Sequence, residues 1–312
     1  MTTESQESHS TAIALIEPAP AEITAGSDVT VKVAVTCSAG CDLGGLPLTV
    51  QGPGDDESTL ATCESGDNEG AEITLKAPRQ IGAQTWRIAF PPHEAGGIRH
   101  DGCSLALTIN TIPHGTSLAV WDIPSPVLKE QPFTIKVGAK SAANSDLKGL
   151  DIAVHGASGA VVARGRLRDT PWPGTSGLYW DEVELSAPAE EGLSKWSVRF
   201  AADGLALPHD GTAAEFSAMV SRPPEHRLTV KVIEQKSKAP IEDVQVRLGP
   251  FRGATDPTGI AEVMMPKGTY DLHVWKAAYE APAHSIDIKG DLSIEVEAVF
   301  VPEEDPDNAW TM

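Results

Sequence analysis

The sequence has few aromatic residues and few cations. Aromatic side chains make up 5% of the 312 residues, and 24 Lys and Arg oppose 44 Asp and Glu, which gives a net charge of −20. So large an excess of acidic groups repels a phosphate backbone and an anionic membrane surface. We therefore expect neither nucleic acid nor membrane among the partners of this protein.

The sequence also lacks long apolar segments and recognisable catalytic motifs. Residues 1–10 are polar, and no apolar run follows them that would act as a signal peptide or a transmembrane helix. This pattern predicts a cytoplasmic protein. No nucleophile elbow, zinc-protease motif, P-loop or Rossmann glycine pattern occurs, so we expect a protein that is not an enzyme.

The sequence does contain an internal repeat, in which one domain occurs twice with a period of about 105 residues. Two aligned blocks and a His-Asp-Gly triplet recur in both copies: Val29–Val50 with Phe133–Val154, Lys76–Phe90 with Ser186–Phe200, and His100–Gly102 with His209–Gly211. Each copy alternates apolar and polar residues, as at Val29, Val31 and Val33. About seven short strands per copy, separated by turns every ~10 residues, predict an immunoglobulin-like β-sandwich.

A shorter, different domain follows the proline-containing linker Ser221–Glu225. A turn at Asp256–Gly259 precedes a strand in which Tyr270, Leu272 and Val274 share one face. The residues that define its pattern are Thr255, Asp256, Gly259, Ala261, Val263, Pro266, Gly268, Tyr270, Leu272, Val274 and Tyr279. This pattern resembles the carboxypeptidase regulatory-like family, which implies a transthyretin-like sandwich and a non-catalytic accessory role. The two N-terminal copies resemble bacterial immunoglobulin-like domains in their general pattern.

The predicted fold is therefore all-β, with three tandem antiparallel β-sandwiches: two immunoglobulin-like repeats and one transthyretin-like (prealbumin-like) domain. The predicted boundaries are a disordered N-terminus at 1–10, the first repeat at 11–112, the second repeat at 116–222, the third domain at 226–301 and an acidic tail at 302–312.

The cysteines all lie in the first repeat, and the second repeat has Ser141 and Ser145 where Cys37 and Cys41 stand. The fold therefore does not require them. Three interpretations are open: reduced thiols without a cofactor, disulfides in an oxidising compartment, or a zinc site. The ligands of such a zinc site would be Cys37, Cys41, Cys63 and Cys103, with His100 as a further candidate. The His-Asp-Gly triplets themselves are typical of turns ahead of a closing strand.

Aromatic residues near prolines and glycines are the candidates for partner contact. They are Trp172, Tyr179 and Trp180 on one loop and strand, and Trp310 in the tail. An exposed loop tryptophan marks a binding surface, whereas the alternative is a loop that folds over its own sandwich. His273 and Trp275 alternate with Val274 and are predicted to lie on the solvent face of a strand.

The function predicted from these features is a non-catalytic accessory or scaffold subunit that binds a protein partner within a larger bacterial complex. One alternative is an exported adhesive or carbohydrate-binding protein, which would carry disulfides. Another is a metal-dependent enzyme that uses Cys37, Cys41, His100 and Cys103.

Overall fold

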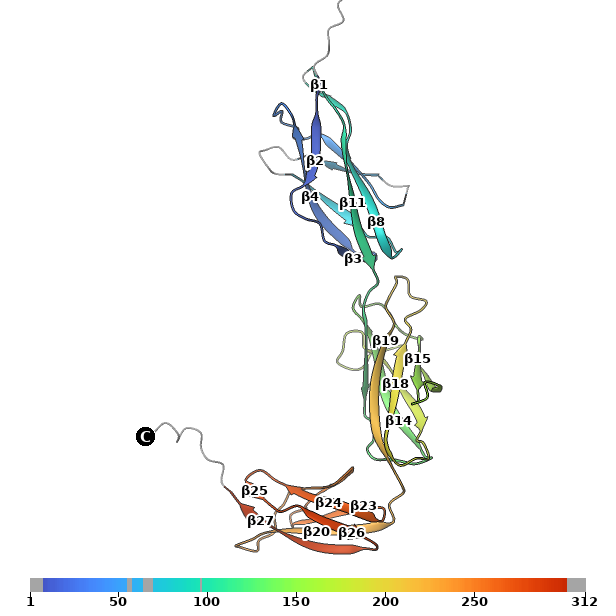
Figure 1. Cartoon of the computed structure of the whole chain (residues 1–312), viewed down its shortest axis with the longest axis vertical. Coiled ribbons are helices and arrows are strands. Elements are labelled where there is room, and N and C mark those ends of the chain that lie inside the picture. Colours follow the sequence, from blue (N-terminus) through green and yellow to red (C-terminus); the bar gives the residue numbers. More distant parts are fainter. Residues whose placement is uncertain (1–7, 55–57, 64–69, 96, 302–312) are drawn as a thin grey trace, which may run out of the picture.

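The computed structural model describes residues 8–54, 58–63, 70–95 and 97–301, and these residues form strands, turns and loops. The strands build three successive β-sandwiches along the chain (Figure 1). The prediction of an all-β chain of tandem sandwiches is confirmed. The described part of the chain holds no helix long and apolar enough to cross a membrane.

The first sandwich packs a three-stranded sheet against a five-stranded sheet, and a small third sheet lies at one end. The three-stranded sheet has the order β2 (Thr11–Leu15), β4 (Asp28–Cys37), β7 (Ala71–Lys76). The five-stranded sheet has the order β3 (Glu22–Thr24), β11 (Cys103–Ile112), β8 (Gly82–Phe90), β5 (Pro47–Gln51), β6 (Ser58–Thr62). The small sheet has the order β1 (Ser8–His9), β10 (Ile98–His100), β9 (His93–Ala95).

The second sandwich repeats the two large sheets strand for strand. Its three-stranded sheet has the order β12 (Thr116–Trp121), β14 (Pro132–Ser141), β17 (Tyr179–Ser186). Its five-stranded sheet has the order β13 (Val127–Leu128), β19 (Thr212–Ser221), β18 (Gly192–Phe200), β15 (Asp151–His155), β16 (Val161–Arg166). In both copies a short early strand pairs in parallel with the last strand of the copy, β3 with β11 and β13 with β19.

The third sandwich packs two four-stranded sheets. One has the order β23 (Ile260–Met265), β20 (His226–Glu234), β27 (Leu292–Phe300), β25 (Tyr279–Glu280). The other has the order β22 (Phe251–Ala254), β21 (Gln245–Leu248), β24 (Gly268–Trp275), β26 (His284–Ile288).

Each sandwich encloses a hydrophobic cluster of its own, because alternate residues of every central strand point inward. In the first copy Trp86, Ile88 and Phe90 of β8 are buried, and in the second copy Trp196, Val198 and Phe200 of β18 occupy the same places. The third cluster is built around Val230, Leu248 and Leu272, among others. Three separate cores of this kind allow each sandwich to be stable by itself.

The first strand of the first sandwich begins three residues before the predicted start of that domain. Ser8–His9 forms β1, which pairs in parallel with Arg99 and His100 of β10. The run Ser8-His9-Ser10 has no apolar alternation, so the sequence pattern gave no sign of a strand there. The rest of the segment 1–10 lies outside the described residues.

In the third sandwich the Thr-Asp turn of the family-like pattern has a clear structural role. The buried Thr255 hydroxyl donates to the Ile241 carbonyl at 2.6 Å and accepts from the Val244 amide at 2.9 Å. Asp256 accepts from the amides of Thr258 and Ile260, and hydrogen bonds from Thr258 and then Ile260 hold the pKa of Asp256 below its usual value. The pattern therefore specifies a turn and its anchor rather than a reactive group.

We expect Thr255→Ala to destabilise the third sandwich by ~1–3 kcal/mol, because it leaves the Ile241 carbonyl and the Val244 amide buried and unpaired. Hydrogen exchange of strands β20–β27 along a urea titration measures this loss. The control Ser293→Ala removes an exposed hydroxyl on β27 and should change stability by less than about 0.5 kcal/mol. Equal effects of the two substitutions would contradict the anchoring role of Thr255.

Candidate metal centre

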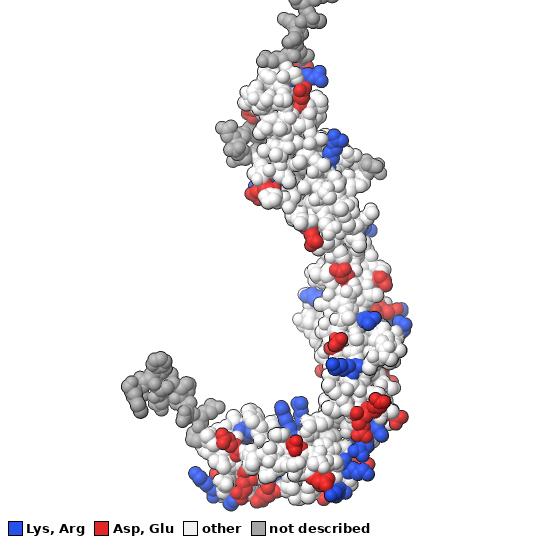
Figure 2. All heavy atoms as spheres, in the orientation of Figure 1, with Lys and Arg blue, Asp and Glu red and all other residues white. Residues whose placement is uncertain are grey.

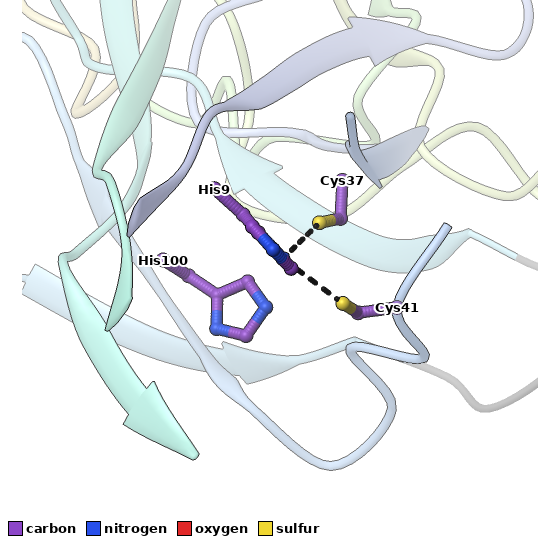
Figure 3. Close-up of side chains that lie close together, drawn as sticks. All are labelled: His9, Cys37, Cys41 and His100. Carbon is purple, nitrogen blue, oxygen red and sulfur yellow. Dashed lines mark hydrogen bonds between the residues drawn. The ribbon is translucent and has the colours of Figure 1, made fainter. Parts of the chain in front are cut away.

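Two histidines and two cysteines of the first sandwich converge at the end where the small sheet lies (Figure 3). The residues are His9, Cys37, Cys41 and His100, and one ligand atom from each lies within 4.8 Å of the others. Of the sequence candidates, the structure thus brings together Cys37, Cys41 and His100. It adds His9, which the sequence analysis did not identify.

Separate backbone elements position the four side chains. His9 is the last residue of β1 and lies opposite His100 at the end of β10. Cys37 ends β4 and lies opposite Thr11 of β2. The chain then turns, with a hydrogen bond from the Gly40 amide to the Cys37 carbonyl and φ of 70° at Gly40, which glycine adopts without strain. This turn returns Cys41 toward the same point.

Two of the distances in the group lie in the range expected around a tetrahedral zinc ion. Zn–N bonds of about 2.0–2.1 Å and Zn–S bonds of about 2.3 Å place neighbouring ligand atoms ~3.3–3.8 Å apart. His9 Nδ1 lies 3.3 Å from Cys41 Sγ and 3.7 Å from Cys37 Sγ (Figure 3). The rings of His9 and His100 are nearly perpendicular, with centroids 5.7 Å apart.

The environment favours ionisation of one of the thiols. Burial opposes the ionised form of Cys37. Hydrogen bonds from the backbone at Ala39 and Cys41 and from the side chains of Cys41 and His9 outweigh it, and they lower the pKa of Cys37 to about 7. A thiolate is the form of cysteine that binds metal.

His100 supplies independent evidence that the group is incomplete without a ligand. Its side chain is 3% exposed, and neither ring nitrogen has a hydrogen-bond partner among the described residues. A buried polar group without a partner costs about 1–3 kcal/mol, so native proteins rarely retain one without a reason. A metal ion bound to one of these nitrogens would satisfy it.

The second sandwich holds the same constellation with oxygen in place of sulfur. His114 and His209 are paired in parallel, as His9 and His100 are, and their ring centroids lie 5.2 Å apart. Ser141 and Ser145 replace the two cysteines and donate to His209 Nε2 at 2.8 and 3.1 Å. His209 Nδ1 in turn donates to the Leu207 carbonyl at 2.8 Å. Both nitrogens of this histidine are therefore satisfied without a metal.

His114, the counterpart of His9, instead joins the first two sandwiches. Its Nε2 donates to the Ala25 carbonyl of the first sandwich at 2.7 Å. Beside this bond, Leu207 packs so closely on Gly26 that a Cβ at Gly26 would lie 2.8 Å from the leucine Cδ2. One member of the second group of residues, His114, thus contributes to the junction between the first two sandwiches.

The other two cysteines lie outside the four-residue group. Cys63 follows β6 and is buried in the core of the sandwich, and its amide donates to the Leu46 carbonyl at 2.9 Å. Burial raises the pKa of the Cys63 thiol, with the charge of Cys103 as the second cause. Cys103 begins β11 opposite Phe90. His93 pairs with His100 across β9 and β10 but does not belong to the group either.

The internal repeat extends to His9, which precedes the first aligned block in the sequence. His9 and Thr11 correspond to His114 and Thr116, because each threonine hydroxyl donates to the carbonyl of the aspartate in the following His-Asp-Gly triplet, Asp101 or Asp210. Extending the repeat alignment to these polar residues would have shown four equivalent positions instead of three.

The predicted partner-binding aromatics form a half-buried cluster on the second sandwich. Trp172 packs edge to face against Trp121 and Trp180, with centroids 5.2 and 4.6 Å away, and all three are partly covered. Two cations lie over the rings: Lys136 Nζ is 5.1 Å from the Trp172 centroid, and the Arg168 guanidinium is 3.8 Å from that of Trp180. The loop therefore covers its own sheet to a large extent.

Two predicted partner-binding aromatic residues remain, Tyr179 and Trp310. Tyr179 opposite Ala139 is also half-buried, and it packs against the core of the second sandwich. Trp310 lies outside the described residues.

We expect Trp172→Ala to destabilise the second sandwich by ~1–3 kcal/mol, because it opens the contacts to Trp121 and Trp180. Calorimetry of the full chain and hydrogen exchange of β14 and β17 measure this loss. Val161→Ala shortens a side chain that is 42% exposed and serves as the control, with an expected change below about 0.5 kcal/mol. An unchanged stability of the Trp172 variant would show a loop that does not cover the sheet.

No known protein-family model matches this chain, and no curated protein sequence matches it. Similar solved structures come from multidomain bacterial proteins. The major pilin subunit BcpA of Bacillus cereus is 10% identical, with 94% of this chain and 99% of the pilin covered and a TM-score of 0.23. The Yersinia pseudotuberculosis adhesin InvE is 15% identical, with 79% and 66% covered and a TM-score of 0.25. Invasin, a bacterial integrin-binding protein, is 12% identical, with 91% and 60% covered and a TM-score of 0.33. The likeness concerns the all-β, tandem-domain architecture.

Proposed function

We propose that the first sandwich binds one zinc ion through His9, Cys37, Cys41 and His100. The observation that supports this best is the buried His100, whose nitrogens lack partners while three further ligands stand within 4.8 Å. A set of two thiolates and two imidazoles suits Zn²⁺ better than Mg²⁺ or Ca²⁺, which prefer oxygen ligands.

The role of this zinc ion is structural rather than catalytic. Four protein ligands fill a tetrahedral coordination sphere and leave no open position for water or substrate. The ion would fasten β1, the end of β4, the loop at Cys41 and β10 to one point. Without it, the two-residue strand β1 is held to the sandwich by a few hydrogen bonds, among them Asp101 N to His9 O at 2.9 Å.

We expect the purified full chain to contain one zinc ion and to lose it in Cys41→Ser. The matched control is Cys103→Ser, which removes a thiol outside the group and should keep the metal. At a free zinc concentration 1,000 times Kd, binding stabilises a protein by about 4.1 kcal/mol. One kcal/mol shifts the Tm of a domain of this size by about 4–8 °C, so chelation should lower the transition of the first sandwich by ~15 °C or more.

Elemental analysis and calorimetry of wild type and both variants measure these effects. A wild-type protein that takes up no zinc under reducing conditions, or a Cys41→Ser variant that binds as much as Cys103→Ser does, would refute the proposed site.

For the chain as a whole, we propose a non-catalytic accessory or scaffold protein that binds a protein partner in the cytoplasm. In support, His9, Cys37, Cys41 and His100 of the first copy lie together at the proposed metal site. In the second copy, His209 of the His-Asp-Gly triplet forms hydrogen bonds with Ser141, Ser145 and Leu207. The partly covered face around Trp172 and Trp180, with Lys136 and Arg168 beside it, offers an aromatic and cationic contact surface.

We also propose that the third sandwich is related to the carboxypeptidase regulatory-like family. The anchored Thr255 and the Asp256 turn support this, since the residues of the pattern occupy turn and core positions.

The alternative function is that of an exported adhesive or carbohydrate-binding protein. The state of the thiols distinguishes the two locations, because exported proteins oxidise their cysteines. We expect all four cysteines to react with an alkylating reagent after the protein is denatured without reductant in its native lysate. A disulfide found by intact-mass measurement would favour the exported protein.

A further inference from the structure

The third sandwich carries an open depression of about 810 Å³ on the outer face of one of its sheets. The depression lies over β21 and β24, whose inward residues Val246, Leu248 and Leu272 belong to the core. The outward side chains that line it include Gln245, Arg247, Asp271, His273 and Trp275. His273 and Trp275 are exposed, as the alternation with Val274 predicts.

The strand register places two arginines and a histidine in one row across three strands. Arg252 of β22 lies opposite Arg247 of β21, and Arg247 lies opposite His273 of β24. Side chains paired in this way are about 4.5–5.5 Å apart at Cβ, and two like charges in such a pair are unfavourable. Neither arginine has an ion pair or a side-chain hydrogen bond within the described chain. The one carboxylate lining the depression, Asp271, lies opposite Ser285 and diagonally to Arg247.

An exposed indole adjoins this basic row. Trp275 lies opposite Gln245, one row beyond Arg247 and His273. It is 66% exposed, which is the largest value among the apolar side chains the structure describes as exposed. A large aromatic surface that is left in water beside unpaired cations marks a place where a ligand with an apolar face can bind.

The charge distribution indicates that an anion would be bound by side chains at the depression and not attracted by the net charge of the protein. Lys, Arg, Asp and Glu intermix on the visible face of the third sandwich, and they are sparse on that of the first (Figure 2). The net charge of −20 repels anions at a distance, but this repulsion is screened beyond about 8–10 Å at physiological salt. An anion that binds here must therefore be held by the arginines themselves.

We propose that this face binds an acidic saccharide, with its carboxylate or sulfate on Arg247 and Arg252 and one face of a sugar ring on Trp275. The guanidinium fork matches a carboxylate in bidentate fashion. The amide of Gln245, the carboxylate of Asp271 and the imidazole of His273 form no other hydrogen bonds with described residues, so they are available to the ring hydroxyls. A peptide would instead favour a sheet edge, where its backbone finds partners, and this site lies on a sheet face.

The proposal is tested by calorimetric titration of the full chain with oligogalacturonate, sialyllactose and a heparin hexasaccharide. Methyl-esterified oligogalacturonate serves as the neutral counterpart. We expect at least one acidic probe to bind with Kd below about 1 mM, and Trp275→Ala and Arg247→Gln each to weaken it about tenfold or more. Met264→Ala, which alters a 49% exposed side chain on the other sheet, should leave the affinity unchanged.

Three results would overturn the proposal: no binding of any acidic probe, equal binding of the neutral ester, or full affinity in the Trp275 variant. Competition by polyglutamate at equal strength would also overturn it, because charge alone would then explain the binding. The proposal is independent of the zinc site, so we expect the same affinity after treatment of the protein with a chelator.

Discussion

A pair of histidines in parallel strand pairing closes one end of each immunoglobulin-like sandwich, and the residues opposite that pair determine what this end does. In the first copy the pair His9–His100 faces two sulfurs, and His100 is buried with unpartnered nitrogens. In the second copy the pair His114–His209 faces two hydroxyls, which satisfy His209 directly. On the same backbone, the end that is hydrogen-bonded through two hydroxyls in the second copy carries two sulfurs in the first, where we propose a metal site.

This difference also explains how the first two sandwiches can share a fold and differ in function. Once His209 is satisfied by Ser141 and Ser145, the remaining histidine of the pair is free to contact the preceding sandwich, and His114 donates to Ala25. The first copy has no sandwich before it within the described residues, and its histidine His9 points at the sulfurs instead. The proposed zinc site in the first copy and the domain junction in the second thus use the same arrangement of strands.

The sequence predicted the sandwiches because period-two alternation and turn residues act locally, as at β8 and β18, and the repeat made the pattern visible twice. One of its three interpretations of the cysteines was a zinc site of Cys37, Cys41, Cys63 and Cys103 with His100 as a further candidate. It did not include His9, since a two-residue polar strand has no hydrophobic pattern. Cys63 could not be separated from the other thiols by spacing alone. Its exclusion depends on the core packing that buries it. Likewise the partial cover of Trp172 depends on contacts with Trp121, which is about fifty residues away.

The most direct measurement of the central claim is X-ray absorption at the zinc edge of the metal-loaded full chain. The account predicts two sulfur ligands at about 2.3 Å and two nitrogen ligands at about 2.0–2.1 Å, with four-coordinate geometry. A first coordination sphere of oxygen and nitrogen only, or one of four sulfurs that would include Cys63 and Cys103, would contradict it.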